Sequence, residues 1–253
     1  MTGALRAAVG AVRARTRAVL PRGLGYAVPS HAPEPEAVVR RRRRTVAVGC
    51  LAGTGMLGVS LQTKPDSPQF YALTAATAAT WTVGALASGP LHQGWIEMQD
   101  GVRRRPVVVP VLTGVGAFGC FVAGGLVAQR VPVLDAAVRR VLRFAEEGSA
   151  PLVVLTTLAN GAAEELFFRG ALYEAVGERR GVLASTLAYT ATTASSRNPS
   201  LVLAGAVMGT LFGLQRRATG GIQAPMLTHL TWSALVLRYL PPLFREQRFR
   251  RVS

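Results

Sequence analysis

The feature that most constrains this chain is a series of long apolar runs, separated by short polar breaks, that begins at residue 45. An apolar run of about 20 residues is long enough for one helical crossing of a lipid bilayer. Backbone polar groups find no water inside a bilayer, so such runs form helices rather than open sheets. We therefore expect an all-α fold, a polytopic transmembrane helix bundle of about seven to eight helices. The expected spans are residues 45–62, 68–89, 106–129, 150–176, 181–196, 200–215 and 221–240.

Positive charge lies between these runs rather than over one folded surface. The formal net charge is +16, yet basic and aromatic residues do not alternate as they do on nucleic-acid-binding faces, so we expect no nucleic-acid partner. The positive-inside rule places the arginine-rich N-terminus in the cytoplasm. The same rule places three further clusters there: Arg103–Arg105, Arg179–Arg180 and Arg216–Arg217.

The C-terminal tail does not fit this count. Seven full crossings would put its arginines, between Arg245 and Arg251, on the outside. The sequence therefore predicts either a re-entrant segment among the later, shorter runs or a span count that is off by one.

The chain divides into four segments. Residues 1–44 form a basic N-terminal cytoplasmic arm, either an amphipathic helix on an anionic membrane surface or a disordered arm. Residues 45–149 hold the first transmembrane helices and, at 132–147, an amphipathic connector at the membrane interface. Residues 150–240 form a transmembrane core, and residues 241–253 a basic tail.

Small and aromatic residues suggest how the helices pack. Glycines in the first and third runs let helix backbones approach closely; they are Gly53, Gly55, Gly58, Gly114, Gly116, Gly119, Gly124 and Gly125. Three tryptophans, Trp81, Trp95 and Trp232, are interpreted as anchors at the membrane interface. The two cysteines lie within apolar runs and are interpreted as buried small side chains.

One helix carries charge where a spanning helix should be apolar. Glu164, Glu165 and Arg169 together oppose burial in a bilayer by roughly 8–10 kcal/mol before pairing. Glu165 and Arg169 stand four residues apart, with the acid first, which favours an ion pair along one helix face. Glu164 lies about 100° around the helix and is free to face a polar cavity. Ionisable residues inside a membrane indicate a functional site, whereas the competing interpretation is a helix end whose charges reach water.

These residues carry a resemblance to a known family. The sequence from Glu164 to Gly170 is similar to the EExxxR motif of the CAAX protease and bacteriocin-processing family of intramembrane proteases, the type II CAAX prenyl endopeptidase-like group. The resemblance extends over roughly residues 150–240. His229 and Ser233 resemble its third motif, with serine where asparagine is usual. The second motif, FxxxH, departs most: Tyr189 stands for the phenylalanine and Thr193 for the histidine.

The resemblance implies peptide-bond hydrolysis in a cavity open to the membrane. Glu164 would activate a water molecule with help from the second-motif histidine, while His229 and Ser233 would stabilise the oxyanion or bind metal. Thr193 neither accepts a proton at neutral pH nor binds zinc as imidazole does. A metal site with two histidines is therefore lost unless His92 or His31 replaces the missing one, and the question of a divalent metal such as zinc stays open.

The sequence thus predicts a CAAX protease-like intramembrane endopeptidase, glutamate- and histidine-dependent, that cuts a membrane-associated peptide or protein in a bacterial plasma membrane. Its catalytic set would be Glu164, Glu165, Arg169, His229 and Ser233. Bacterial relatives are linked to peptide maturation or bacteriocin self-immunity. Two alternatives remain: a catalytically silent membrane scaffold or immunity protein of the same fold, and a small proton-coupled transporter using Glu164 and His229.

Overall fold

The computed structural model describes Val28, residues 34–97 and residues 102–252, with side chains through Phe244 in the last stretch. Most of the predicted N-terminal arm, residues 1–27 and 29–33, lies outside the described residues. The first described helix, α3, spans Glu36–Ser60 and begins nine residues before the expected span, so it includes the arginine run that opens at Arg40.

Helices account for nearly all of the described structure, which confirms the predicted all-α bundle. After α3 come α4 (Pro68–Ser88), α5 (Val108–Ala128), α6 (Pro132–Glu147) and α7 (Ala150–Glu164). A π-helix, η1 (Glu165–Leu172), continues α7 into α8 (Tyr173–Val176). The chain ends with α9 (Glu178–Ala194), α10 (Pro199–Thr219) and α11 (Gln223–Val252). A two-residue ladder, β1 (Ile96–Glu97) with β2 (Arg103–Arg104), lies between α4 and α5.

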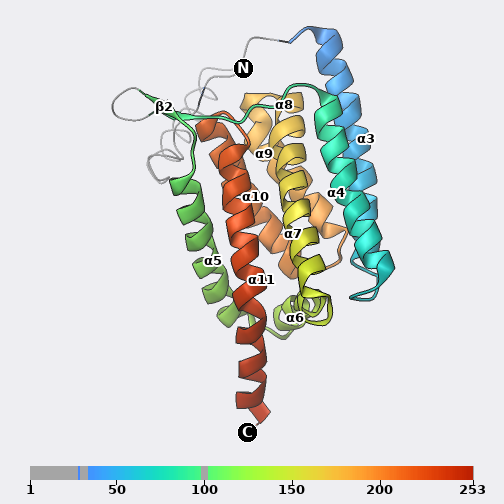
Figure 1. Ribbon diagram of the computed structural model, residues 1–253, viewed down its shortest axis with the longest axis vertical. Helices are drawn as coiled ribbons and strands as arrows, with labels where there is room; N and C mark the ends of the chain where they lie inside the picture. Colours follow the sequence, from blue (N-terminus) through green and yellow to red (C-terminus); the bar gives the residue numbers. More distant parts are fainter. Residues whose placement is uncertain (1–27, 29–33, 98–101, 253) are drawn as a thin grey trace, which may run out of the picture.

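Consecutive long helices alternate in direction along the bundle (Figure 1). The α3, α5, α9 and α11 helices run one way, and α4, the continuous α7–η1–α8 helix and α10 run the other way. Their closest packing joins α3 to α4, α9 to α10, and α5 to α11. Among the described helices, none of the long ones turns back within the bundle (Figure 1). The α11 helix ends opposite the start of α3 (Figure 1).

Membrane character is evident on the outside of the bundle. Two described helices, α4 and α5, are long and apolar enough by length and composition to cross a membrane, and only 6% of the most apolar stretch of α5 is buried. Large apolar side chains also point outward from other helices, including Leu51 on α3 and Leu187 on α9. Exposed apolar side chains of this kind are typical of a surface that is covered by lipid or by another protein.

The α6 helix closes one end of the bundle, across the ends of the long helices (Figure 1). Its inner face is buried at Ala137 and Leu142, while Arg140, Arg143, Glu146 and Glu147 are exposed. The side-chain amide of Asn198 donates to the Ala137 carbonyl over 2.8 Å, which ties α6 to the start of α10.

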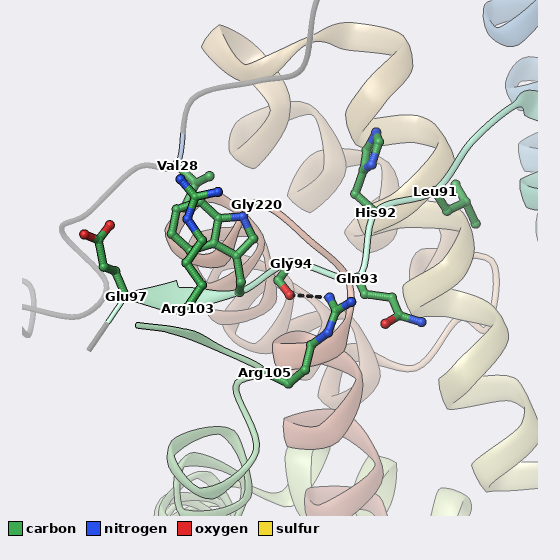
Figure 2. A pocket seen from close by; sticks show the side chains of 10 residues that line it. Val28, Leu91, His92, Gln93, Gly94, Glu97, Arg103, Arg105 and Gly220 are labelled. Atoms are coloured by element: carbon green, nitrogen blue, oxygen red, sulfur yellow. Dashed lines mark hydrogen bonds between the residues drawn. The ribbon is translucent and has the colours of Figure 1, made fainter. Parts of the chain in front are cut away.

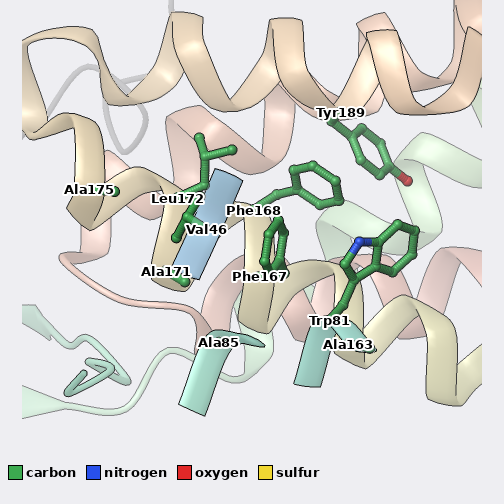
Figure 3. Close-up of a cluster of buried hydrophobic side chains, with 10 residues drawn as sticks. All are labelled: Val46, Trp81, Ala85, Ala163, Phe167, Phe168, Ala171, Leu172, Ala175 and Tyr189. Carbon is green, nitrogen blue, oxygen red and sulfur yellow. The ribbon is translucent and has the colours of Figure 1, made fainter. Parts of the chain in front are cut away.

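An aromatic core holds the charged helix in the bundle interior (Figure 3). Phe167 and Phe168 are fully buried, and Phe168 meets the edge of Trp81 with ring centroids 5.6 Å apart. Trp81 is itself 0% exposed, so its predicted role as an interfacial anchor is wrong. The ring fits because α3 has no side chain at Gly53, where a Cβ atom would lie 2.1 Å from Trp81 Nε1.

The glycine prediction holds in part. Gly53, Gly58 and Gly114 lie against neighbouring helices, and Gly125 lies against Phe244. The other four face open space, because a Cβ atom added to them would meet nothing within 4 Å: Gly55, Gly116, Gly119 and Gly124. Glycine composition alone does not tell which helix face is covered.

Candidate functional site

The charged motif occupies the point where α7 changes into a π-helix. From Glu165 to Leu172 the backbone follows the wider π-helical spiral before α8 resumes. Such insertions are rare and occur mostly at functional sites. The sequence predicted one uninterrupted helix over residues 150–176, which is correct for its extent but not for this widened turn.

Glu165 and Arg169 form the predicted ion pair, and both side chains are fully buried. Arg169 Nη1 lies 3.1 Å from Glu165 Oε1. Its Nη2 donates to the Gly209 carbonyl of α10 over 3.2 Å. The guanidinium also lies 4.5 Å from the ring centre of Tyr189 and 5.0 Å from that of Phe212. These contacts from α9 and α10 replace the water that a buried arginine loses.

His229, on α11, meets the same carboxylate. Its Nδ1 lies 2.9 Å from Glu165 Oε1, and its ring stacks on Phe212 with centroids 4.7 Å apart. Because Glu165 is paired with Arg169, we assign it as ionised, and an ionised carboxylate only accepts hydrogen bonds. Nδ1 therefore donates to Glu165, and in the neutral tautomer of His229 the lone pair of Nε2 faces the opposite side.

The Glu164 side chain points away from the Glu165–Arg169 pair and toward Nε2 of His229. Its Oε2 lies 3.9 Å from His229 Nε2 and accepts a 2.7 Å hydrogen bond from the Tyr189 hydroxyl. The side chain is 14% exposed, whereas that of Glu165 is 0% exposed. The two adjacent glutamates thus have different surroundings: Glu165 is enclosed by protein, and Glu164 borders a cavity.

The cavity has a volume of about 350 Å³ and extends from Glu164 to α6. Tyr189, Thr193, His229 and Ser233 border it near Glu164. Toward α6 its walls are mainly apolar and include Leu57, Phe70, Val141, Phe144 and Leu240. A mostly apolar cavity with a few convergent polar groups is the usual form of a ligand site.

The predicted site residues therefore come together from three elements: Glu164, Glu165 and Arg169 from the α7–η1 junction, and His229 and Ser233 from α11. Ser233 is 4% exposed and lies one helical turn after His229. Two further residues were missed. Tyr189 was assigned only the place of a phenylalanine, and Trp232 was interpreted as an interfacial anchor, although it borders the cavity 5.9 Å from the His229 ring.

At the second-motif position, the Thr193 hydroxyl bonds to its own helix rather than to the residues around Glu164. Thr193 borders the cavity, but its hydroxyl donates to the Thr190 carbonyl over 2.8 Å. A Cβ atom at Gly205 would lie only 2.6 Å from Thr193 Oγ1, so the side chain is wedged against α10.

The histidine considered as its replacement lies elsewhere. His92 borders a second pocket at the arginine-rich end of the bundle, with Gln93, Glu97, Arg103 and Arg105 (Figure 2). In that pocket Arg105 donates to the Gly94 carbonyl over 2.8 Å. Glu164 does not border it, so recruitment of His92 is wrong. His31 lies outside the described residues.

A zinc site of the usual kind does not fit the side chains around Glu164. Catalytic zinc takes three protein ligands. Facing the cavity, Glu164 and His229 offer two, while Glu165 is held by Arg169 and the Thr193 hydroxyl is a poor ligand. Across the described residues, no group of three His, Cys, Asp or Glu side chains has metal-binding geometry.

Comparison with known proteins agrees with the motif pattern. Residues 146–235, about a third of the chain, match the family model described as type II CAAX prenyl endopeptidase Rce1-like. No curated protein and no solved structure gives a significant match. The matched segment begins at the end of α6 and includes Glu164, Tyr189, His229 and Ser233. Over residues 146–235 the chain therefore resembles the membrane-embedded, Rce1-like type II CAAX prenyl endopeptidases, in agreement with the CAAX protease pattern.

Proposed function

We propose that this chain is an intramembrane endopeptidase that hydrolyses a peptide bond of a membrane-associated peptide or protein. The observation that carries the proposal is the 3.9 Å approach of Glu164 Oε2 to His229 Nε2 at the border of a largely apolar cavity. These atoms come from different helices, and both residues lie within the segment that matches a protease family model.

A water molecule fits the gap between these two atoms. At a hydrogen-bond length of about 2.8 Å from each, one water would bridge them. Glu164 would take a proton from this water while Nε2 of His229 accepts a hydrogen bond from its other hydrogen. The water oxygen would bond to the carbonyl carbon of the substrate, and the carbonyl electron pair would move to its oxygen. When this tetrahedral intermediate collapses, the C–N bond breaks. The leaving amine takes the proton that Glu164 had accepted from the water.

Donors to the developing oxyanion must come from groups other than neutral His229. With its proton on Nδ1, the imidazole presents only a lone pair to the cavity. The Ser233 hydroxyl, one turn further along α11, is a neutral donor that borders the same cavity. Glu165 and Arg169 would act indirectly, because their pairing fixes the ring of His229 and its tautomer.

The orientation that we propose for the protein in the membrane rests on its arginine clusters. Arg40, Arg104, Arg179 and Arg216 lie in or beside helix ends that meet at one end of the bundle (Figure 1). We place that end in the cytoplasm of a bacterial plasma membrane by the positive-inside rule. The cavity would then extend from the middle of the bundle toward α6 on the outer side.

One observation favours a second function, a catalytically silent scaffold or bacteriocin immunity protein with this fold. Thr193 directs its hydroxyl to the backbone instead of toward Glu164, so the site lacks the second-motif base. Such a protein would bind its membrane partner in the same cavity without cutting it.

The two functions are separated by comparing the membrane peptidomes of cells that express the native chain and Glu164→Gln. Glutamine has nearly the same size as glutamate but cannot take up the proton. The proposal expects peptides with new termini only with the native chain. Glu36→Gln, an exposed change at the start of α3, serves as the matched control and should give the native profile. Identical profiles for native and Glu164→Gln chains would support the silent scaffold.

A further inference from the structure

Two side chains of α9 stand one helical turn apart and face the same cavity, yet only one of them contacts the glutamate. Thr193 donates to Thr190 of its own helix over 2.8 Å, whereas the Tyr189 hydroxyl donates to Glu164 Oε2 over 2.7 Å. Relative to the FxxxH pattern, tyrosine at position 189 adds a hydroxyl donor, and threonine at position 193 stands in place of a histidine.

The Tyr189 ring is held on several sides, so the position of its hydroxyl is fixed. Phe168 meets the ring edge-on with centroids 5.2 Å apart, and the Arg169 guanidinium lies 4.5 Å from the ring centre. On the α10 side, a Cβ atom at Gly209 would lie 3.3 Å from Tyr189 Cδ1, so that helix approaches the ring without a side chain. Figure 3 shows the hydroxyl end of Tyr189 pointing out of this aromatic cluster. The side chain is 7% exposed.

We propose that Tyr189 is a positioning residue for Glu164, supplying the hydrogen bond that a histidine at position 193 would otherwise provide. The inference rests on the proposed endopeptidase function. A carboxylate oxygen accepts more than one hydrogen bond, so Oε2 can hold the Tyr189 hydroxyl and still accept one from water. Tyr189 thereby keeps Oε2 beside His229 Nε2, within reach of a shared water. Without the Tyr189 hydroxyl, the Glu164 carboxylate would rotate into the cavity. Its Oε2 would then lie beside His229 Nε2 for a smaller fraction of the time.

The test uses the full-length protein in proteoliposomes and a synthetic peptide whose cleavage distinguishes native membranes from Glu164→Gln membranes. Tyr189→Phe removes only the hydroxyl. We expect kcat to fall about 10- to 100-fold, the range for losing a hydrogen bond to a charged group, while KM stays within about twofold. Adding Thr193→His to Tyr189→Phe should recover at least about tenfold of the lost kcat, because it returns a donor to the same helix face. A purely structural role for Tyr189 would not be rescued in this way.

Tyr173→Phe is the matched control. Tyr173 is 2% exposed on α8, and its hydroxyl has no hydrogen-bond partner among the described residues. This variant should cleave the peptide at the native rate. All variants should have the elution volume of the native protein in size-exclusion chromatography, and its melting temperature.

Two results would overturn the inference while leaving the endopeptidase in place: a Tyr189→Phe enzyme with native kcat, or a double variant as slow as Tyr189→Phe alone. A native protein that cleaves no faster than Glu164→Gln would instead overturn the endopeptidase and, with it, this role of Tyr189.

Discussion

The outer helix α6 and the buried helix η1 each carry an acid and an arginine four residues apart, in very different surroundings. On α6, the Arg143 and Glu147 side chains are 58% and 48% exposed and meet over 2.8 Å. In η1, Glu165 and Arg169 are both fully buried and meet over 3.1 Å. The buried pair also contacts His229 on α11 and Gly209 on α10. Equal spacing in the sequence therefore gives a minor surface contact in one region and a junction of helices in the other.

The largest difference between the two regions should appear when each arginine is replaced by leucine. Arg169→Leu leaves the buried Glu165 carboxylate without its counter-charge, which should lower the free energy of unfolding by about 3–5 kcal/mol. Arg143→Leu should change it by no measurable amount, because solvent already competes for that pair. Denaturation by SDS titration in mild detergent measures both. Similar losses for the two variants would show that burial does not distinguish these pairs.

A pair of glycines extends the comparison to apolar packing. Gly53→Ala places a Cβ atom 2.1 Å from Trp81 Nε1, inside the aromatic core, and should cost about 1–3 kcal/mol through displacement of the ring. Gly55→Ala meets nothing within 4 Å and should gain up to about 1 kcal/mol, because alanine favours the helix. The same unfolding titration measures these changes. If both substitutions changed stability in the same direction, Gly53 and Gly55 would not differ in their contact with α4, which would contradict the packing of α3 on α4 described above.

The smallest effect concerns titration on α6. The hydrogen bond from Arg143 lowers the pKa of Glu147 from its ordinary value. A lowered pKa in the folded state means that any contribution of the pair to stability, too small to measure by unfolding, is present above the unfolded pKa and is lost as pH falls through the folded pKa. Arg143→Leu should raise the pKa of Glu147 back to its ordinary value, because the hydrogen bond that lowers it is gone. Carboxyl carbon NMR of the labelled protein would measure it, and an unchanged titration would mean that the pair does not form in solution.

Spacing and hydropathy predicted a large part of this molecule. The helix over residues 150–176, the connector over 132–147 and the Glu165–Arg169 pair all follow from patterns within single helices. Each depends on local periodicity, which a sequence displays directly. The meeting of Glu164 with His229 was predicted from motif resemblance rather than from periodicity, since 65 positions separate them.

Features that depend on neighbouring helices were not predicted. Gly53 and Gly55 lie in the same stretch of small and apolar residues in the sequence. Only the placement of α4 decides which of them faces Trp81. The Tyr189 hydroxyl reaches Glu164 through the rotation of α9 against η1, and the π-helical turn has no residue pattern that distinguishes it from an α-helix. These are properties of packing, so the sequence of one helix does not determine them.

The central claim, that Glu164 takes the proton from an attacking water, is tested most directly with purified protein in proteoliposomes. The peptide found by the membrane comparison would be incubated in water enriched in oxygen-18, with either the native chain or Glu164→Gln, and the products weighed by mass spectrometry. The account predicts new C-termini carrying one heavy oxygen with the native chain, and a rate at least about 100-fold lower with Glu164→Gln. Cleavage by Glu164→Gln at the native rate would contradict it.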